Sequence, residues 1–243
     1  MKRKALIISI KGTRLTKMER LLISKEAPWG VILFKRNLKS FKQTKELINK
    51  IKLLANNKKF PILIDEEGLK VSRLKNIIDH NISANFFGSL FNSNKIFSIR
   101  LLKHYINSLS KILKGLGINI NTIPVLDVLR NNTNKIIGNR SFSKNKNIVK
   151  ELGKLTIKYL HSNKIAGVIK HIPGHGATSL DSHKKKPIIK SSFKILNSID
   201  FYPFKLSRAK LAMTAHVLYL NIDKKNVATF SKKISYKIIF VRS

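Results

Sequence analysis

The sequence predicts an α/β protein built on a parallel β-sheet, and it favours a single (β/α)8 barrel over a doubly wound sheet. Short apolar, β-branched runs alternate with longer amphipathic segments, which is the pattern of repeated strand-helix units. No stretch rich in Pro, Gly or Ser divides the 243 residues, and we find no internal repeat. We therefore expect one domain over residues 1–243, a length that suits one barrel.

The expected elements follow one another in a regular order. Strands are predicted where apolar, β-branched runs of four to six residues occur, at 5–10, 30–34, 62–65, 118–123, 167–171 and 212–216. Helices are predicted where apolar residues recur at three- and four-residue spacing, at 40–56, 94–116 and 145–163.

Polar residues gather where several of these strands end. Asp65 and His216 each end an expected strand, Asp127 follows another, and the segment that starts at Lys170 begins with the last two residues of a fourth. In a (β/α)8 barrel the carboxyl ends of the strands carry the active site. We therefore expect these polar groups to converge on one face, with Asp127 and His216 supporting the top layer of the barrel without a need to contact a substrate.

The segment KHIPGHGATSLDSH, residues 170–183, holds three of the seven histidines. His171, His175, Asp181 and His183 are all potential metal ligands, but the proline and glycine between the first two histidines prevent the helical spacing typical of zinc sites. A phosphate site would need a glycine-rich turn that opens into a helix, and this form is absent. We expect no metal and no cofactor.

General acid/base catalysis suits this segment better. Asp181 and His183 are two residues apart, so in a non-helical segment both side chains can point to the same side. The carboxylate would then fix the histidine tautomer and leave the second ring nitrogen free to transfer a proton near neutral pH. A turn that Asp181 and His183 merely cap is an equally good interpretation of the spacing alone.

Six motifs in the same order resemble those of the glycoside hydrolase family 3 β-N-acetylhexosaminidases, bacterial enzymes that remove N-acetylglucosamine from recycled cell-wall fragments. The motifs are GVILFKRN (30–37), IDEEGLKVSRL (64–74), INTIPVLDV (120–128), IGNRSFS (137–143), KHIPGHGATSLDSH (170–183) and MTAHVLY (213–219). The resemblance implies a TIM barrel and a retaining mechanism, in which a carboxylate attacks the anomeric carbon and water then releases the sugar.

The resemblance also implies roles for individual residues. His183 matches the family's acid/base, which protonates the leaving oxygen, and Asp181 matches the aspartate that orients this histidine. Lys170 and His171 match the pair that binds sugar hydroxyls.

Two further residues complete the substrate-binding set that the family implies. Arg140 matches the arginine that holds the substrate, and Asp65 matches a strand-end aspartate suited to accepting two hydroxyl hydrogen bonds.

Two positions depart from the family's pattern. Leu69 stands where the family has a turn glycine, and Asn139 stands where an acidic residue often precedes the arginine, so a charge that could hold Arg140 is lost.

The pattern departs most at the carboxyl end. ATFSKK, residues 228–233, matches the family, but the motif that carries its nucleophile aspartate does not follow before Ser243. We expect a C-terminally truncated barrel that lacks about the last two strand-helix units, with no nucleophile and little hydrolysis by this chain. The alternative is a non-catalytic remnant that binds N-acetylglucosamine or a muropeptide, the substrate class that the family implies.

The charge is extreme, because 49 Lys and Arg against 12 Asp and Glu give a net charge of +37. Such a charge attracts nucleic acids and anionic membranes. The lysines are scattered, however, and accompany many Ile and Asn residues, a bias that an A/T-rich coding sequence also produces. We expect no specific nucleic-acid partner; a dedicated binder would show steep salt dependence with bulk DNA and no effect of sugar.

Cysteine is absent from the sequence, which excludes disulfides and thiol catalysis within it. The apolar run near the amino terminus is six residues long, shorter than the core of a signal peptide. No run approaches the roughly 20 apolar residues of a membrane span. We expect a cytoplasmic monomer with no membrane partner.

Overall fold

The computed structural model describes residues 3–131, 133–178, 187–205 and 209–235, and its main feature is a six-stranded parallel sheet. The strands pair in the order β1 (Lys4–Ser9), β2 (Pro28–Leu33), β3 (Ile62–Ile64), β4 (Ile120–Asn121), β5 (Ala166–Ile172) and β7 (Leu211–Thr214). Each of these strands overlaps one that the sequence predicts. Spatial order follows chain order, as in a barrel, whereas a doubly wound sheet reverses direction at a switch point.

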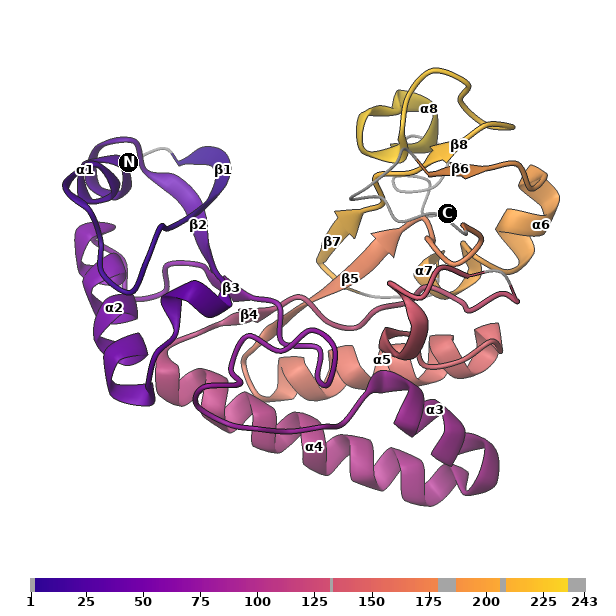
Figure 1. Cartoon of the computed structure of the whole chain (residues 1–243), viewed down its shortest axis with the longest axis horizontal. Helices are drawn as coiled ribbons and strands as arrows, with labels where there is room; N and C mark the ends of the chain where they lie inside the picture. The colour runs from indigo at the N-terminus through magenta and orange to yellow at the C-terminus, as the bar shows by residue number, and fades with distance from the viewer. Residues whose placement is uncertain (1–2, 132, 179–186, 206–208, 236–243) are drawn as a thin grey trace.

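The sheet forms a half-barrel with helices on its outer side. Figure 1 shows the strands as a curved arc, with β1 at one end and β5 and β7 toward the other. The predicted helices are confirmed as α2 (Phe41–Leu54), α4 (Lys95–Leu116) and α5 (Lys146–Ser162). None of the helices in the described part of the chain is long and apolar enough to cross a membrane.

Several shorter elements were not predicted. Two of the helices that precede β4 are among them, namely α1 (Lys17–Lys25) and α3 (Ala84–Ser93). A second parallel pair joins β6 (Ile188–Ile189) to β8 (Leu218–Tyr219). Short helices α6 (Phe193–Ser198), α7 (Tyr202–Lys205) and α8 (Lys232–Ile234) and three 3-10 turns, Lys35–Asn37, Gly138–Arg140 and Ala228–Phe230, make up the rest. α1 is nine residues long and buries only Ile23.

The long helices begin at polar residues that cap them. The side chains of Ser40, Asn94 and Asn145 accept hydrogen bonds from backbone N–H groups of the first turns of α2, α4 and α5. Beyond the cap, each helix buries a stripe at three- and four-residue spacing, which in α4 comprises Leu102, Ile106, Leu109 and Leu113. The caps fix where each helix starts, and the stripe fixes which side faces the sheet.

β4 is shorter than predicted, with Ile120–Asn121 in place of 118–123. At its start the side chain of Asn119 replaces a backbone bond, since its Oδ1 accepts from the N–H of Ile62 at 2.8 Å. After its end comes Pro124, which has no N–H to continue the ladder.

The sheet's inner face is built in layers. Leu63, Ile120 and Val168, on neighbouring strands, form a small apolar cluster. Because side chains two residues apart on a strand point to the same face, the next layer toward the carboxyl ends consists of Asp65, Thr122 and Lys170. The inner face of the sheet therefore changes from an apolar layer to a polar layer over two residues of each strand. The polar layer lies at the carboxyl ends of the strands, where the active site of a barrel is expected.

Candidate active site

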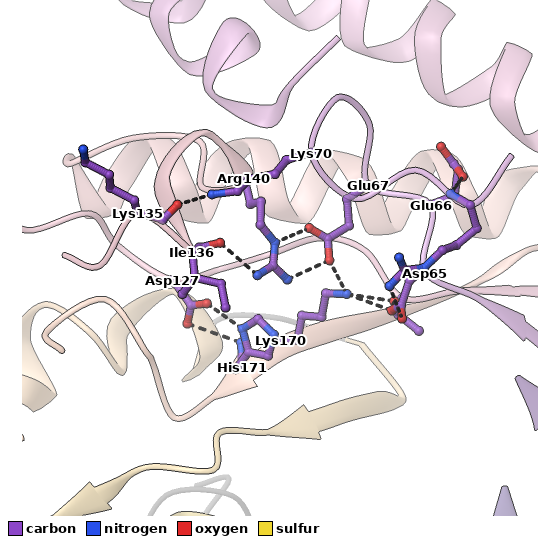
Figure 2. A network of polar contacts seen from close by, with 12 residues as sticks. Asp65, Glu66, Glu67, Lys70, Asp127, Lys135, Ile136, Arg140, Lys170 and His171 are labelled. Carbon is purple, nitrogen blue, oxygen red and sulfur yellow. Dashed lines mark hydrogen bonds and ion pairs between the residues drawn. The ribbon is translucent and has the colours of Figure 1, made fainter. Parts of the chain in front are cut away.

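Lys170 is the centre of this polar layer. Its side chain is 2% exposed, and its ammonium donates to Asp65 Oδ1 at 3.1 Å and to Thr122 Oγ1 at 2.8 Å. It also pairs with Glu67 Oε1 at 2.5 Å. Figure 2 shows the Lys170 ammonium directed toward Asp65 and Glu67. A buried lysine is therefore balanced by two carboxylates, as burial of a charge requires.

Asp65 stays ionised in this setting. Burial opposes its ionisation, but the ammonium of Lys170 and the hydroxyl of Thr122 outweigh that effect, so the pKa of Asp65 lies below its ordinary value. Arg73 Nη2 lies 3.6 Å from Asp65 Oδ2, and the Asp65 side chain is 15% exposed. A charged, partly accessible carboxylate can accept hydrogen bonds from hydroxyl groups of a ligand.

Arg140 is held by Glu67 in a two-bond arrangement. Its Nε and Nη2 donate to the two carboxylate oxygens at 2.6 and 2.9 Å, and Nη1 donates to the carbonyl of Ile136 at 3.2 Å. Burial disfavours the charged guanidinium, but Glu67 outweighs it and the pKa of Arg140 lies above its ordinary value. Glu67 thus supplies the charge that Asn139 lacks, and Arg140 is fixed without an acidic neighbour in the chain.

His171 is oriented by Asp127. The His171 Nδ1 lies 2.7 Å from Asp127 Oδ2, and Asp127 Oδ1 accepts from the N–H of His175 at 2.7 Å. Asp127 is fully buried; burial opposes its ionisation, but His171 outweighs this and holds the pKa of Asp127 below its ordinary value. Since the carboxylate only accepts, His171 carries its proton on Nδ1 toward Asp127, which leaves Nε2 to face a ligand.

His175 lies beside this pair as a neutral group. Its ring meets that of His171 edge to face with centroids 5.9 Å apart, and burial lowers the pKa of His175 below its ordinary value. Its Nδ1 is buried and has no hydrogen-bond partner among the described residues. Within that same part of the chain, no group of three or more His, Cys, Asp or Glu could hold a metal ion.

The expected substrate-binding residues Asp65, Arg140, Lys170 and His171 lie at one edge of the sheet (Figure 2). Asp181 and His183, the expected acid/base pair, lie outside the described residues. Asp127 does support the layer from below, but His216 is exposed and meets the Phe230 ring instead, with centroids 5.9 Å apart.

Sequence reasoning assigned no role to Glu67, Thr122 or Arg73. Glu67 links the two basic residues of the site, and the only signal was its place two residues after Asp65 in an irregular segment. Thr122 could have been predicted, because it lies two residues after Ile120 and side chains two apart on a strand point to the same face. Arg73 stands in the quoted IDEEGLKVSRL motif, but its spacing alone did not place it beside Asp65.

The departure at Leu69 is accommodated by the turn. Gly68, not residue 69, takes the left-handed conformation with φ of +118°, and a Cβ there would come within 2.0 Å of the carbonyl oxygen of Ile82. Leu69 is 48% exposed and has no positive φ, so a side chain at this position meets no strain.

Comparison with known proteins places these features in a family. The sequence profile described as Glycosyl hydrolase family 3 N terminal domain matches residues 4–239. The chain is 33% identical to a beta-hexosaminidase of Nitrosomonas eutropha over 94% of its own length and 66% of that protein. It is 32% identical to beta-hexosaminidase A of Pseudoalteromonas piscicida over 85% of its own length and 36% of that protein. The chain thus spans about a third to two thirds of the length of these relatives.

Solved structures give the same relationship. NagZ from Neisseria gonorrhoeae, in complex with N-trifluoroacetyl-D-glucosamine, superposes with a TM-score of 0.90 at 29% identity, covering 98% of this chain and 70% of that one. A glycoside hydrolase family 3 beta-N-acetylglucosaminidase from Paenibacillus gives a TM-score of 0.83 at 29% identity, covering 94% of this chain and 44% of that one.

Proposed function

The chain belongs to glycosyl hydrolase family 3, and from this premise we propose that its polar layer binds a terminal β-N-acetylglucosaminyl residue as part of a retaining β-N-acetylhexosaminidase. The observation that carries the proposal is the contact of Lys170 with Asp65 at the carboxyl edge of the sheet, with Arg140 and His171 beside it. The complex of Neisseria gonorrhoeae NagZ with N-trifluoroacetyl-D-glucosamine supports the same ligand class.

Each side chain has a suitable part in holding a sugar. Asp65 is ionised and partly exposed, so its carboxylate accepts bonds from two hydroxyl groups. The free Nε2 of His171 accepts a hydrogen bond from a sugar hydroxyl. Lys170 takes part by holding the Asp65 carboxylate toward the sugar, because its ammonium already contacts Asp65, Thr122 and Glu67. The guanidinium of Arg140, fixed by Glu67, donates to a further oxygen of the substrate. These groups are positioned before the sugar arrives, so binding orders few side chains.

The chemical step is proposed to follow double displacement. His183 protonates the glycosidic oxygen as the bond to the leaving group breaks, while a carboxylate attacks the anomeric carbon. The donated proton leaves with the released alcohol. Water then attacks the glycosyl-enzyme, His183 takes a proton from that water, and the bond between the sugar and the carboxylate breaks, which restores both groups. Asp181 orients His183 and stabilises its charged form.

The attacking carboxylate is proposed to come from outside these 243 residues, because no segment of the sequence resembles the family's nucleophile motif. The chain alone would then bind the sugar and hydrolyse it slowly or not at all. This makes a non-catalytic binder of N-acetylglucosamine the second candidate. A muropeptide substrate, which the family resemblance implies, and a single-domain cytoplasmic monomer, which we expect from the sequence, form part of the proposal.

The test is release of chromophore from a chromogenic β-N-acetylglucosaminide by the purified chain, with His183→Ala as the control. Turnover that disappears in His183→Ala would mean that another group replaces the nucleophile and that His183 is the acid/base. No turnover combined with saturable binding of N-acetylglucosamine would favour the binding candidate. Neither turnover nor binding would contradict both.

A further inference from the structure

The segment 65–82, which leads from β3 toward α3, carries three charged groups of the site but little regular structure. Asp65, Glu67 and Arg73 all lie on it, and its backbone has one isolated β-bridge, between Gly68 and Val71, and a few turn bonds such as that from the N–H of Leu69 to the carbonyl of Ile82 at 3.1 Å. Regular hydrogen bonding therefore does not fix these three side chains. Contacts elsewhere in the segment must do so.

Glu66 is the centre of those contacts. Its side chain is 0% exposed, and Oε2 accepts from the backbone N–H groups of Arg73 at 2.7 Å and Leu74 at 2.8 Å. The amide of Asn121 bonds to both the N–H and the carbonyl of Glu66, at 3.0 Å each. Figure 2 shows Glu66 turned away from the Arg140 and Lys170 cluster, whereas Glu67 points into it.

His80 completes the arrangement from the far end of the segment. Its Nε2 lies 2.8 Å from Glu66 Oε1, and its side chain is 14% exposed. Because the carboxylate only accepts, Nε2 carries the proton of this bond. The hydroxyl of Tyr105, on α4, lies 3.4 Å from His80 Nδ1, and the two rings meet edge to face at 5.7 Å.

Continuous contacts therefore run from Tyr105 through His80 and Glu66 to the backbone of Arg73. This backbone sets where the guanidinium of Arg73 lies, 3.6 Å from the carboxylate of Asp65. Neither Glu66 nor His80 has a side-chain bond to Asp65, Glu67, Arg140 or Lys170 among the described residues. Their effect on the site must pass through the backbone of segment 65–82.

We propose that Glu66 and His80 are positioning residues, which fix segment 65–82 so that Asp65 and Arg73 present a preformed surface to the sugar. The inference rests on the proposed function, since it concerns the affinity of the same site. A carboxylate fully buried in this way needs its partners, because removal of one leaves the charge without compensation. The segment would then relax, and the site would lose its preformed geometry.

The test compares His80→Leu with His80→Gln, whose side-chain N–H can take the place of Nε2. Calorimetric titration with N-acetylglucosamine should show affinity about tenfold weaker in His80→Leu and within about threefold of the unchanged chain in His80→Gln. His104→Leu, which changes an exposed histidine on α4, is the matched control and should bind normally. Normal affinity in His80→Gln but not in His80→Leu would show that the hydrogen bond to Glu66 matters, and not only the volume that the His80 side chain fills.

A second measurement does not depend on sugar binding. Amide hydrogen exchange at Arg73 and Leu74 should accelerate at least about tenfold in His80→Leu and remain slow in His80→Gln. If the unchanged chain does not bind the sugar, the proposed function fails while exchange still tests the positioning role. Folded His80→Leu with normal exchange and normal affinity would overturn the inference. If His80→Leu does not fold, Glu66→Gln decides, because normal affinity and exchange in that variant would also overturn it.

Discussion

At the residue scale the site depends on charge balance around Lys170. Its ammonium is almost fully buried, and it contacts Asp65 and Glu67 while Arg140 shares the second of these carboxylates. Burial opposes the ionisation of Glu67, yet Lys170 and Arg140 hold the pKa of Glu67 below its ordinary value. Two cations and two carboxylates therefore form one network, in which no member can be neutralised without affecting the others.

Glu67→Gln should be strongly destabilising. The substitution keeps the shape of the side chain but leaves the two buried cations with Asp65 as their nearby carboxylate. We expect the free energy of unfolding to fall by about 3 kcal/mol, the cost of breaking a buried ion pair from one side. Urea unfolding of the variant and the unchanged chain at pH 7 measures this difference in free energy.

The matched control is Glu151→Gln, which breaks an exposed pair with Lys95 at 3.0 Å. It should cost less than about 1 kcal/mol. Equal losses in the two variants would show that Glu67 has no special role in the network.

The residues proposed to bind the sugar were easier to predict from the sequence than the residues that hold them in place. Asp65, Arg140, Lys170 and His171 stand in recognisable motifs, and the structure brings them to one edge. Glu67 was missed because it lies in a loop. A loop lacks the regular alternation of side chains by which, in a strand or helix, the sequence indicates which way a residue points. Glu67 compensates for Asn139 through its contact with Arg140, 73 positions away in the chain, and single-sequence patterns do not reveal contacts at that separation.

At the scale of elements, the strands and long helices followed from local patterns, while their ends did not. The runs that became β2, β3 and β5 are apolar because both faces of a parallel sheet are covered, and such runs are visible in the sequence. The shortening of β4 depends on the side chain of Asn119 bonding to another strand. A hydrogen bond between a side chain and a distant strand cannot be predicted from the local sequence.

The connection after β5 has no room for a single added methyl group at Gly176. A Cβ on Gly176 would come within 1.8 Å of the carbonyl oxygen of Val128, which follows Asp127 in the chain. Gly176→Ala should therefore displace the backbone beside Asp127 and disturb His171. We expect a loss of about 2 kcal/mol or more in unfolding free energy and weaker binding of N-acetylglucosamine, measured by urea unfolding and calorimetry.

Gly12→Ala is the control for Gly176→Ala. A Cβ on Gly12 would meet nothing within 4 Å, and its φ is not positive. This variant should be neutral or slightly stabilising, within about 1 kcal/mol of the unchanged chain. A neutral Gly176→Ala would contradict the close packing inferred for the connection.

At the scale of the whole molecule, the net charge of +37 makes stability depend on the few carboxylates. Lowering the pH removes negative charges and increases repulsion among the lysines and arginines. The folded chain keeps the pKa values of Asp65, Glu67 and Asp127 below their ordinary values. Their stabilisation is therefore present above an unfolded pKa of about 4 and is lost as the pH falls through the lower folded values.

Two variants should alter this acid dependence in opposite directions. Asp127→Asn removes a group with a lowered pKa, so its stability relative to the unchanged chain should fall as the pH rises from 3 toward 7. Asp200 is different, because burial raises its pKa despite the bond from Arg130. Asp200→Asn should therefore gain relative stability over the same pH rise. Urea midpoints across this range test both, and the same sign in the two variants would contradict the assigned shifts.

We propose that the polar layer recognises an N-acetylglucosaminyl group, and titration of the 243-residue chain with N-acetylglucosamine decides whether it does. Two-dimensional amide NMR should show saturable shifts for residues near Asp65, Arg140 and Lys170, much weaker shifts with glucose, and loss of binding in Asp65→Ala. A folded chain with no saturable response, or with identical responses to both sugars and in Asp65→Ala, would contradict the claim.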